Sequence, residues 1–205
     1  MLTELLLMLA ASTVPLKQMP VDECRNDKSF SAFRKQLEQV VRRRDFPALM
    51  KMTAPDVTYL MEDAPGSREG FRREFRNGRD PKFWTELSTA MRLGCGMAND
   101  MAWMGSVPDG LFDRDDPAYY VLVVVSGAAL RAQPRSDARI VAKLAWDVVE
   151  LLDDGSESFA LVKLRDGRTG YVRREELRDQ FGDPAASFEK REGKWVLTRF
   201  APDEP

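Results

Sequence analysis

Residues 123–177 read VVVSGAALRAQPRSDARIVAKLAWDVVELLDDGSESFALVKLRDGRTGYVRREEL, and this stretch decides the fold that we expect. Runs of β-branched and aromatic residues alternate here with turn-forming residues at the short intervals typical of a small all-β domain. We expect strands over 119–125, 140–144, 148–152 and 159–164, with a tight turn at Asp166-Gly167. The spacing predicts a small β-barrel over residues 119–178.

The motifs of this segment resemble those of the bacterial SH3-like (SH3b) family. The closing step DGRTGYV at 166–172 is the most specific match, and Leu130-Arg131 followed by Pro134 matches the end of the entry strand. Gly170 lets the backbone approach closely before Tyr171 packs. The resemblance covers residues 119–178 and does not extend to the N-terminal region.

The sequence departs from the family pattern at Gln133, at Phe159-Ala160 and at Trp146-Asp147, in or beside the loops that bind ligands in such barrels. The resemblance implies a module that binds a peptide or a peptidoglycan feature through exposed aromatic and polar loop residues. It gives Arg131, Trp146 and Tyr171 as candidate ligand-binding residues. The alternative is that both aromatic residues are partly buried packing residues and that Arg131 is a solvated loop charge.

Residues 24–96 are expected to form a mainly helical N-terminal region. Apolar residues recur at helical spacing over 27–44, and three polar residues, Asp45, Ser67 and Asp80, stand where further helices would begin. A break is expected at Pro55, a short strand over 57–61, and a helix end at Gly94. The predicted fold class is therefore α+β, with a mainly helical N-terminal region, a small SH3-like β-barrel and a C-terminal β-hairpin.

Residues 97–118 lose all periodicity and are rich in Gly, Pro and Asp, which is typical of a linker. Four of its acidic residues lack the alternating spacing and the distal glutamate of a calcium-binding loop: Asp109, Asp113, Asp115 and Asp116. We expect no metal site.

The hairpin is predicted over residues 185–200, with a turn at Glu192-Gly193. It resembles the closing strands of small cone-shaped α+β proteins related to nuclear transport factor. That resemblance implies that the hairpin returns to the helices and that the barrel is inserted between them. The alternative is a hairpin that extends or covers the barrel.

Residues 1–16 resemble a signal peptide, because the apolar run 5–11 is followed by small residues and is too short to span a bilayer. Glu4 and the lack of a basic residue before the run favour an ordinary apolar helix instead. Export predicts a periplasmic or secreted protein in which the two cysteines, Cys24 and Cys95, form a disulfide. Two free thiols in a cytosolic protein are the alternative.

The chain contains no histidine, so Ser-His-Asp and Cys-His activation and imidazole metal sites are excluded. Its formal net charge of -2 provides no cationic field for nucleic acid. We expect no catalytic residue, no cofactor and no transmembrane segment after signal removal. An enzyme would need carboxylates with displaced pKa values in a deep pocket.

Four arginines recur at helical spacing and form a candidate patch for an anionic partner: Arg68, Arg72, Arg76 and Arg79. A solvated helix face, offset by neighbouring acidic residues, is the alternative.

The leading hypothesis is an exported, non-catalytic binding protein of the cell envelope whose partner is a peptide, peptidoglycan or an envelope protein. The alternative is a structural or assembly protein in which the barrel packs internally and the arginine-bearing helix contacts a protein or anionic partner.

Overall fold

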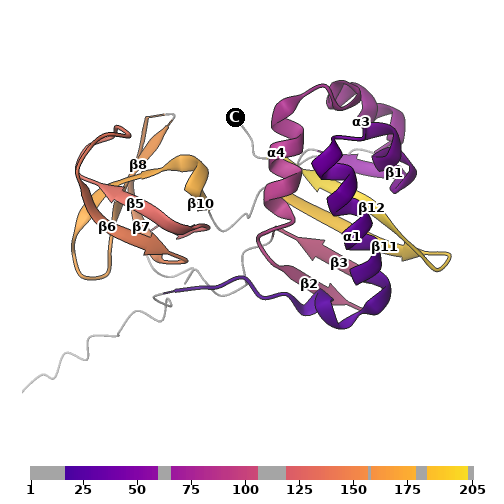
Figure 1. Ribbon diagram of the computed structural model, residues 1–205, viewed down its shortest axis with the longest axis horizontal. Helices are drawn as coiled ribbons and strands as arrows, with labels where there is room; N and C mark the ends of the chain where they lie inside the picture. The colour runs from indigo at the N-terminus through magenta and orange to yellow at the C-terminus, as the bar shows by residue number, and fades with distance from the viewer. Residues whose placement is uncertain (1–16, 60–65, 106–118, 157, 179–183, 203–205) are drawn as a thin grey trace, which may run out of the picture. The chain divides into compact units, whose positions relative to one another are not determined.

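The computed structural model describes residues 17–59, 66–105, 119–156, 158–178 and 184–202, which divide into two compact units (Figure 1). The helix–sheet unit combines Met19–Pro108 with Arg178–Pro205, and the β unit combines Met1–Gln18 with Asp109–Leu177. The chain therefore leaves the helix–sheet unit once and returns to it. The predicted signal peptide, residues 1–16, and the acidic group at 109–116 lie outside the described residues.

Each α-helix of the helix–sheet unit begins at a residue whose side chain caps it, and three of these residues were the predicted helix starts. The side chains of Asp27, Asp45, Ser67 and Asp80 each accept a backbone N–H of the first turn, at 2.7 to 3.0 Å. The elements are η1 (Glu23–Asn26), α1 (Lys28–Arg43), α2 (Phe46–Lys51), α3 (Arg68–Glu74), η2 (Arg76–Gly78) and α4 (Pro81–Ala90).

The strands of this unit form a five-stranded sheet in the order β1-β12-β11-β3-β2, and α1 and α4 cross one face of it (Figure 1). The strands are β1 (Thr53–Tyr59), β2 (Cys95–Ala98), β3 (Met101–Met104), β11 (Ala185–Arg191) and β12 (Lys194–Ala201). The predicted C-terminal hairpin is β11–β12, and it lies at the centre of this sheet between β1 and β3. It therefore returns to the helices and belongs to their unit.

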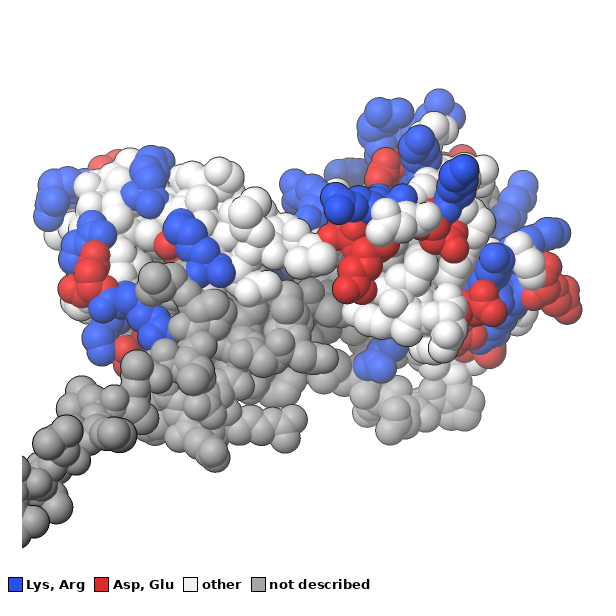
Figure 2. Space-filling view, turned by 90° about the horizontal axis from the view of Figure 1, so that it is seen from below, with Lys and Arg blue, Asp and Glu red and all other residues white. Residues whose placement is uncertain are grey.

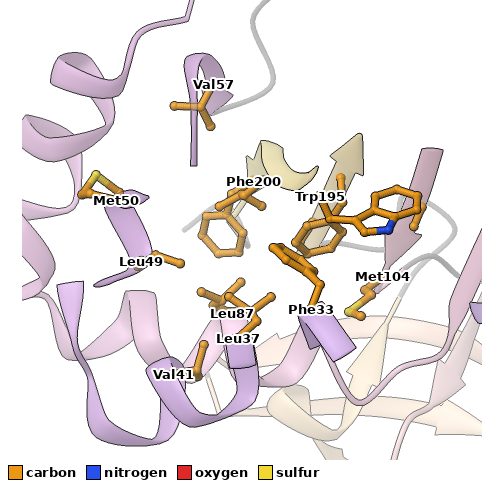
Figure 3. Close-up of a cluster of buried hydrophobic side chains, with 14 of the residues drawn as sticks. Phe33, Leu37, Val41, Leu49, Met50, Val57, Leu87, Met104, Trp195 and Phe200 are labelled. Atoms are coloured by element: carbon orange, nitrogen blue, oxygen red, sulfur yellow. The ribbon is translucent and has the colours of Figure 1, made fainter. Parts of the chain in front are cut away.

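Aromatic side chains from the helices and the hairpin pack together between the helices and the sheet (Figure 3). The Phe30 ring meets the Trp195 ring edge-on with centroids 4.9 Å apart, and the Trp195 indole N–H donates to Ser29 Oγ at 2.9 Å. Phe83 and Phe200 meet at 5.4 Å on the same core. These contacts fix the hairpin against α1 and α4, because each aromatic ring buries a large apolar area.

The β unit is a seven-stranded sheet in the order β10-β4-β7-β8-β9-β5-β6. Its elements are β4 (Tyr120–Val123), β5 (Ser126–Arg131), β6 (Ile140–Ala145), β7 (Val148–Ser156), β8 (Phe159–Lys163), β9 (Thr169–Arg173), η3 (Arg174–Glu176) and β10 (Leu177–Arg178). Alternate residues, such as Leu130, Val162 and Val172, form a core of their own. The side chains between them lie on the other face.

The predicted fold class is wrong. Within the described part of the chain the protein is mostly β, with twelve strands in two open sheets and only four α-helices. The expected small barrel is not closed, because β10 and β6 are the two edges of the seven-stranded sheet. Three strands that share a sheet with the hairpin were not expected there: β1 lies inside the expected helical region 24–96, β2 crosses its end, and β3 lies in the expected linker 97–118.

Two features of the sequence explain why β1 was predicted only in part and why β2 and β3 were not predicted. Pro55 was expected to break the chain, but it lies inside β1, an edge strand, where a missing backbone N–H is tolerated. The strands β2 and β3 are short and carry Ala, Met and Gly instead of the β-branched residues typical of strands. They are ordered by strand pairing, since β3 pairs with β11 and β2 pairs with β3.

Candidate functional site

Cys24 and Cys95 form a disulfide that joins η1 to β2. Their Cα atoms lie 5.7 Å apart, and 71 positions separate them in the sequence. The Cys95 backbone N–H also donates to the Val21 carbonyl at 2.9 Å. The covalent bond and the backbone pairing together hold the segment before α1 against the sheet.

The same segment is held by a two-armed ion pair between Arg34 and Asp22. The two guanidinium nitrogens of Arg34 donate to the two carboxylate oxygens of Asp22 at 2.9 and 2.8 Å. The hydrogen bonds from Arg34 lower the pKa of Asp22, against the opposing effect of partial burial.

Two of the three predicted ligand-binding residues lie side by side on the β unit. Arg131 at the end of β5 is the cross-strand partner of Tyr171 on β9, and Tyr171 is in turn the partner of Leu161 on β8. All three are half-buried and alternate with core residues, so they share the outer face of the sheet.

Two charged residues lie on the same face as Tyr171, because alternate residues of a strand point to the same side of the sheet. Lys163 and Arg173 stand two residues from Leu161 and Tyr171 on their strands and therefore share their face. The Arg173 guanidinium lies 5.5 Å from the centroid of the Phe159 ring and donates to Ser136 Oγ at 2.6 Å. We call the group Arg131, Phe159, Leu161, Lys163, Tyr171 and Arg173 the Tyr171 face.

Arg131 also has a structural contact, which is part of the alternative interpretation of this residue. One of its guanidinium nitrogens donates to the Ala138 carbonyl at 3.0 Å and so holds the loop between β5 and β6. Burial raises the pKa of the nearby Glu176 carboxyl, while the positive charges of Arg173 and Arg131 oppose that rise.

Trp146, the third predicted residue, does not join the Tyr171 face. It lies in the turn between β6 and β7 with a backbone φ of 60°. The Gln18 backbone N–H donates to its carbonyl at 2.8 Å, and Lys17 forms an ion pair with the adjacent Asp147 at 3.0 Å. The turn therefore binds residues 17 and 18 through one backbone hydrogen bond and one ion pair.

A small hollow of about 190 Å³ lies farther along the same sheet, around β4, β7 and β8. It contains the ion pair between Lys163 Nζ and Glu150 at 2.8 Å, and the Arg165 guanidinium lies 5.5 Å from the Tyr120 ring centroid. The hydrogen bond from Lys163 to Glu150 raises the pKa of the lysine. Lys163 and Glu150 are thus paired with each other, and Arg165 lies over an aromatic ring.

The four arginines of the predicted anionic patch do not lie on one helix. The helix α3 ends at Glu74, and Arg76 and Asn77 have positive φ values of 48° and 54°, so helical spacing does not continue to Arg79. Arg68 donates to the Thr53 carbonyl and is half-buried. Arg72, Arg76 and Arg79 make no side-chain hydrogen bond or ion pair with the described residues, and Figure 2 shows basic side chains gathered along one edge of this unit.

Lys163 and Arg173 were not predicted as site residues, although the alternation of residues along 159–163 and 169–173 contains the signal.

No helix of the described residues is long and apolar enough to cross a membrane.

Comparison with known proteins leaves the family of the chain open. No family model matches it, and no curated protein matches it. One similar solved structure, from Xanthomonas campestris, is described as a calcium/calmodulin dependent protein kinase II association domain. The match covers 94% of this chain and 98% of that one, at 12% identity and a TM-score of 0.30, which does not establish a common fold.

Proposed function

We propose that the protein is an exported, non-catalytic binding protein of the cell envelope, and that the Tyr171 face binds a carboxylate-bearing peptide. The peptide component of peptidoglycan and an extended segment of an envelope protein both have this chemistry. The observation that carries the proposal is the register of β5, β9 and β8, which places Arg131, Tyr171 and Leu161 in one cross-strand row.

The row combines the side chains that recognition of such a peptide needs. A tyrosine ring and a leucine offer apolar contact area, and the phenolic hydroxyl can donate or accept a hydrogen bond. The guanidinium of Arg131 has donors left after its single bond to Ala138, and guanidinium groups bind carboxylates through two parallel bonds. The resemblance of residues 119–178 to the SH3-like family remains a prediction that agrees with this function.

Export is supported by the disulfide. Disulfides persist in oxidising compartments and are rare in the cytosol, where thiols are kept reduced. The predicted leader at residues 1–16 precedes the first cysteine in the sequence. The mature N-terminus and the thiol count of secreted material test both expectations together, and free thiols on an uncleaved chain would contradict them.

The absence of catalysis is proposed from the placement of the carboxyl groups. Glu176 has a raised pKa among the described residues, but it does not line the hollow around Glu150 and Lys163. Glu150, which does line that hollow, is bonded to Lys163. A general acid or base must reach its substrate, and neither carboxyl meets this need.

Cosedimentation with purified sacculi tests the binding function. We expect the full chain to sediment with sacculi above the level of an unrelated protein of similar charge. Tyr171→Ala should weaken binding about tenfold, because truncating a central aromatic contact typically costs more than 1 kcal/mol. Tyr119→Ala is the matched control, since Tyr119 is 40% exposed and lies outside the Tyr171 face. No sedimentation of the wild type, or equal losses in both variants, would contradict the proposal.

A second function, assembly through an arginine-bearing surface, is supported by Arg72, Arg76 and Arg79, whose charges lack partners among the described residues. Charge reversal by Arg72→Glu with Arg76→Glu should release an anionic partner that copurifies with the wild type. If every copurifying partner remains, this function is excluded.

A further inference from the structure

A groove of about 520 Å³ lies between the C-terminal half of α1 and the length of α4. All of its lining residues belong to these two helices and the residues that directly follow them. Its volume falls in the range of about 300–1,000 Å³ that is typical of small-molecule sites. It belongs to the helix–sheet unit and shares no residue with the Tyr171 face.

The apolar part of the groove is formed by Val41, Trp84 and Met91. Val41 and Trp84 are 7% and 3% exposed, so they are fixed by the core on which they stand, and Figure 3 places Val41 beside Leu37 and Leu87. The Trp84 indole N–H donates to the Gly78 carbonyl at 2.7 Å. Its polar atom is therefore already bonded, and the small part of the ring that reaches the groove is apolar.

The charged part of the groove consists of Arg42, Arg44 and Arg92, against the single carboxylate of Glu38. All three arginines are exposed. Arg42 and Arg44 make no side-chain hydrogen bond or ion pair within the described part of the chain, and Arg92 reaches only Thr89 Oγ1, at 3.4 Å. The groove thus has an excess of two positive charges that internal contacts do not neutralise.

Two other arginines of the same unit are each paired with carboxylates. Arg34 is bonded to Asp22, and Arg191 is bonded to both Asp56 and Glu189. The groove arginines differ from these in converging on a hollow with an apolar floor.

Positive charges near helix C-termini also have a structural role, because they interact favourably with the helix dipole. Arg42 and Arg44 stand at the end of α1, and Arg92 follows α4. Arg43 shares that role, since it is in the last turn of α1, but it does not line the groove. The dipole explains basic residues at these positions; it does not explain the apolar floor beneath three of them.

We propose that this groove binds a small organic anion. The apolar body of the ligand lies on Val41, Trp84 and Met91, and its carboxylate, phosphate or sulfonate group lies among the guanidinium groups of Arg42, Arg44 and Arg92. The side chain of Ser88, which also lines the groove, adds a hydroxyl donor, whereas the hydroxyl of Thr85 already donates to the Pro81 carbonyl at 3.2 Å. This site is independent of peptide recognition by the β unit.

Titration of the full chain with 8-anilinonaphthalene-1-sulfonate, an aromatic anion, tests the proposal by fluorescence. We expect saturable binding at one site per chain and weaker binding at high salt. The neutral analogue N-phenyl-1-naphthylamine should bind at least tenfold more weakly, because it lacks the anionic group. Equal affinity for the two dyes would overturn the proposal.

Variants place the dye in the groove. Arg42→Gln and Arg92→Gln should each raise the Kd about tenfold, whereas Arg43→Gln, a charge-matched change on the same surface, should leave it unchanged. Ser88→Trp fills the groove and should abolish binding, while Gln39→Trp, an exposed position on α1 outside the groove, should not. Each variant is first checked for an unchanged circular dichroism spectrum.

The same titration on Tyr171→Ala separates this proposal from the proposed function. Unchanged dye binding in that variant supports a separate site, and loss of binding there would place the dye on the β unit and overturn the proposal. Equal effects of Arg42→Gln and Arg43→Gln would overturn it as well, since they would show a response to net charge alone.

Discussion

The ion pair between Arg34 and Asp22 should make the helix–sheet unit sensitive to acid. The hydrogen bonds from Arg34 lower the folded pKa of Asp22 below its ordinary value of 3.8. The stabilisation is therefore fully present above about pH 4 and is lost as the pH falls through the folded pKa. Asp22→Asn should lower the free energy of unfolding by about 1 kcal/mol at pH 7, a modest value because the Asp22 side chain is 36% exposed.

Urea denaturation at pH 7 and at pH 3 measures this effect, and the difference between wild type and variant should shrink at the lower pH. Glu69→Gln is the control, because the Glu69–Arg73 pair is 3.8 Å apart and both side chains are at least 70% exposed. If Asp22→Asn lowers the free energy of unfolding by the same amount at pH 3, the cause is lost packing and not lost charge.

Single residues were predicted from the sequence to the extent that local chemistry decides them. The caps at Asp45, Ser67 and Asp80 depend on a few adjacent residues, and the structure confirms them. The closeness of Arg131 and Tyr171 depends on the register between β5 and β9, which no local pattern contains. The position of Trp146 was likewise not predictable from adjacent residues, because the turn between β6 and β7 places it away from that pair.

The turn of the β11–β12 hairpin should be improvable by one substitution. Glu192 and Gly193 both have positive φ values, 50° and 76°, between the paired residues Arg191 and Lys194. Asn tolerates this conformation better than Glu, and Asn-Gly is the preferred pair in such turns. We expect Glu192→Asn to raise the free energy of unfolding by about 0.5–1 kcal/mol, measured by denaturant titration of the tryptophan fluorescence.

The opposite change at the same position provides the control. Glu192→Val should lower stability, because a β-branched residue fits positive φ poorly. If Asn and Val had the same effect, the backbone conformation of this turn would not be the cause.

Elements were predicted well where a strong local signal marks them and poorly where partners define them. The helices and the hairpin have caps, periodicity and a Gly-containing turn. Only the end of β1 was predicted, as a short strand over 57–61, because Pro55 was expected to break the chain before it. The strands β2 and β3 are short and poor in β-branched residues. The strands β1 and β3 pair with β12 and β11, which lie far along the chain, and β2 joins the sheet through β3, so their own residues do not reveal this pairing.

At the scale of the whole molecule, the separation of the two cores was the decisive feature. The hairpin follows the β unit in the sequence, yet its aromatic residues Phe188, Trp195 and Phe200 complete the core begun by α1. Nearness in the sequence favoured a hairpin on the β unit, whereas burial of aromatic area favoured its return to the helices. The groove between α1 and α4 follows from that return, since the helices are held by the sheet they cover.

The two cores also predict where the disulfide acts. The bond between Cys24 and Cys95 closes a loop of 71 positions within the helix–sheet unit, which corresponds to a stabilisation of about 4 kcal/mol. In the double variant Cys24→Ser with Cys95→Ser, amide hydrogen exchange should accelerate in α1, β11 and β12. Exchange in β8 and β9 should stay as in the wild type, because these strands belong to the other core.

A reducing agent is the control: it should accelerate the same exchange in the wild type and have no further effect on the double variant. Equal acceleration in β8 and β9 would show that the units unfold together, and unchanged exchange in β11 and β12 would show that the bond does not stabilise its own unit.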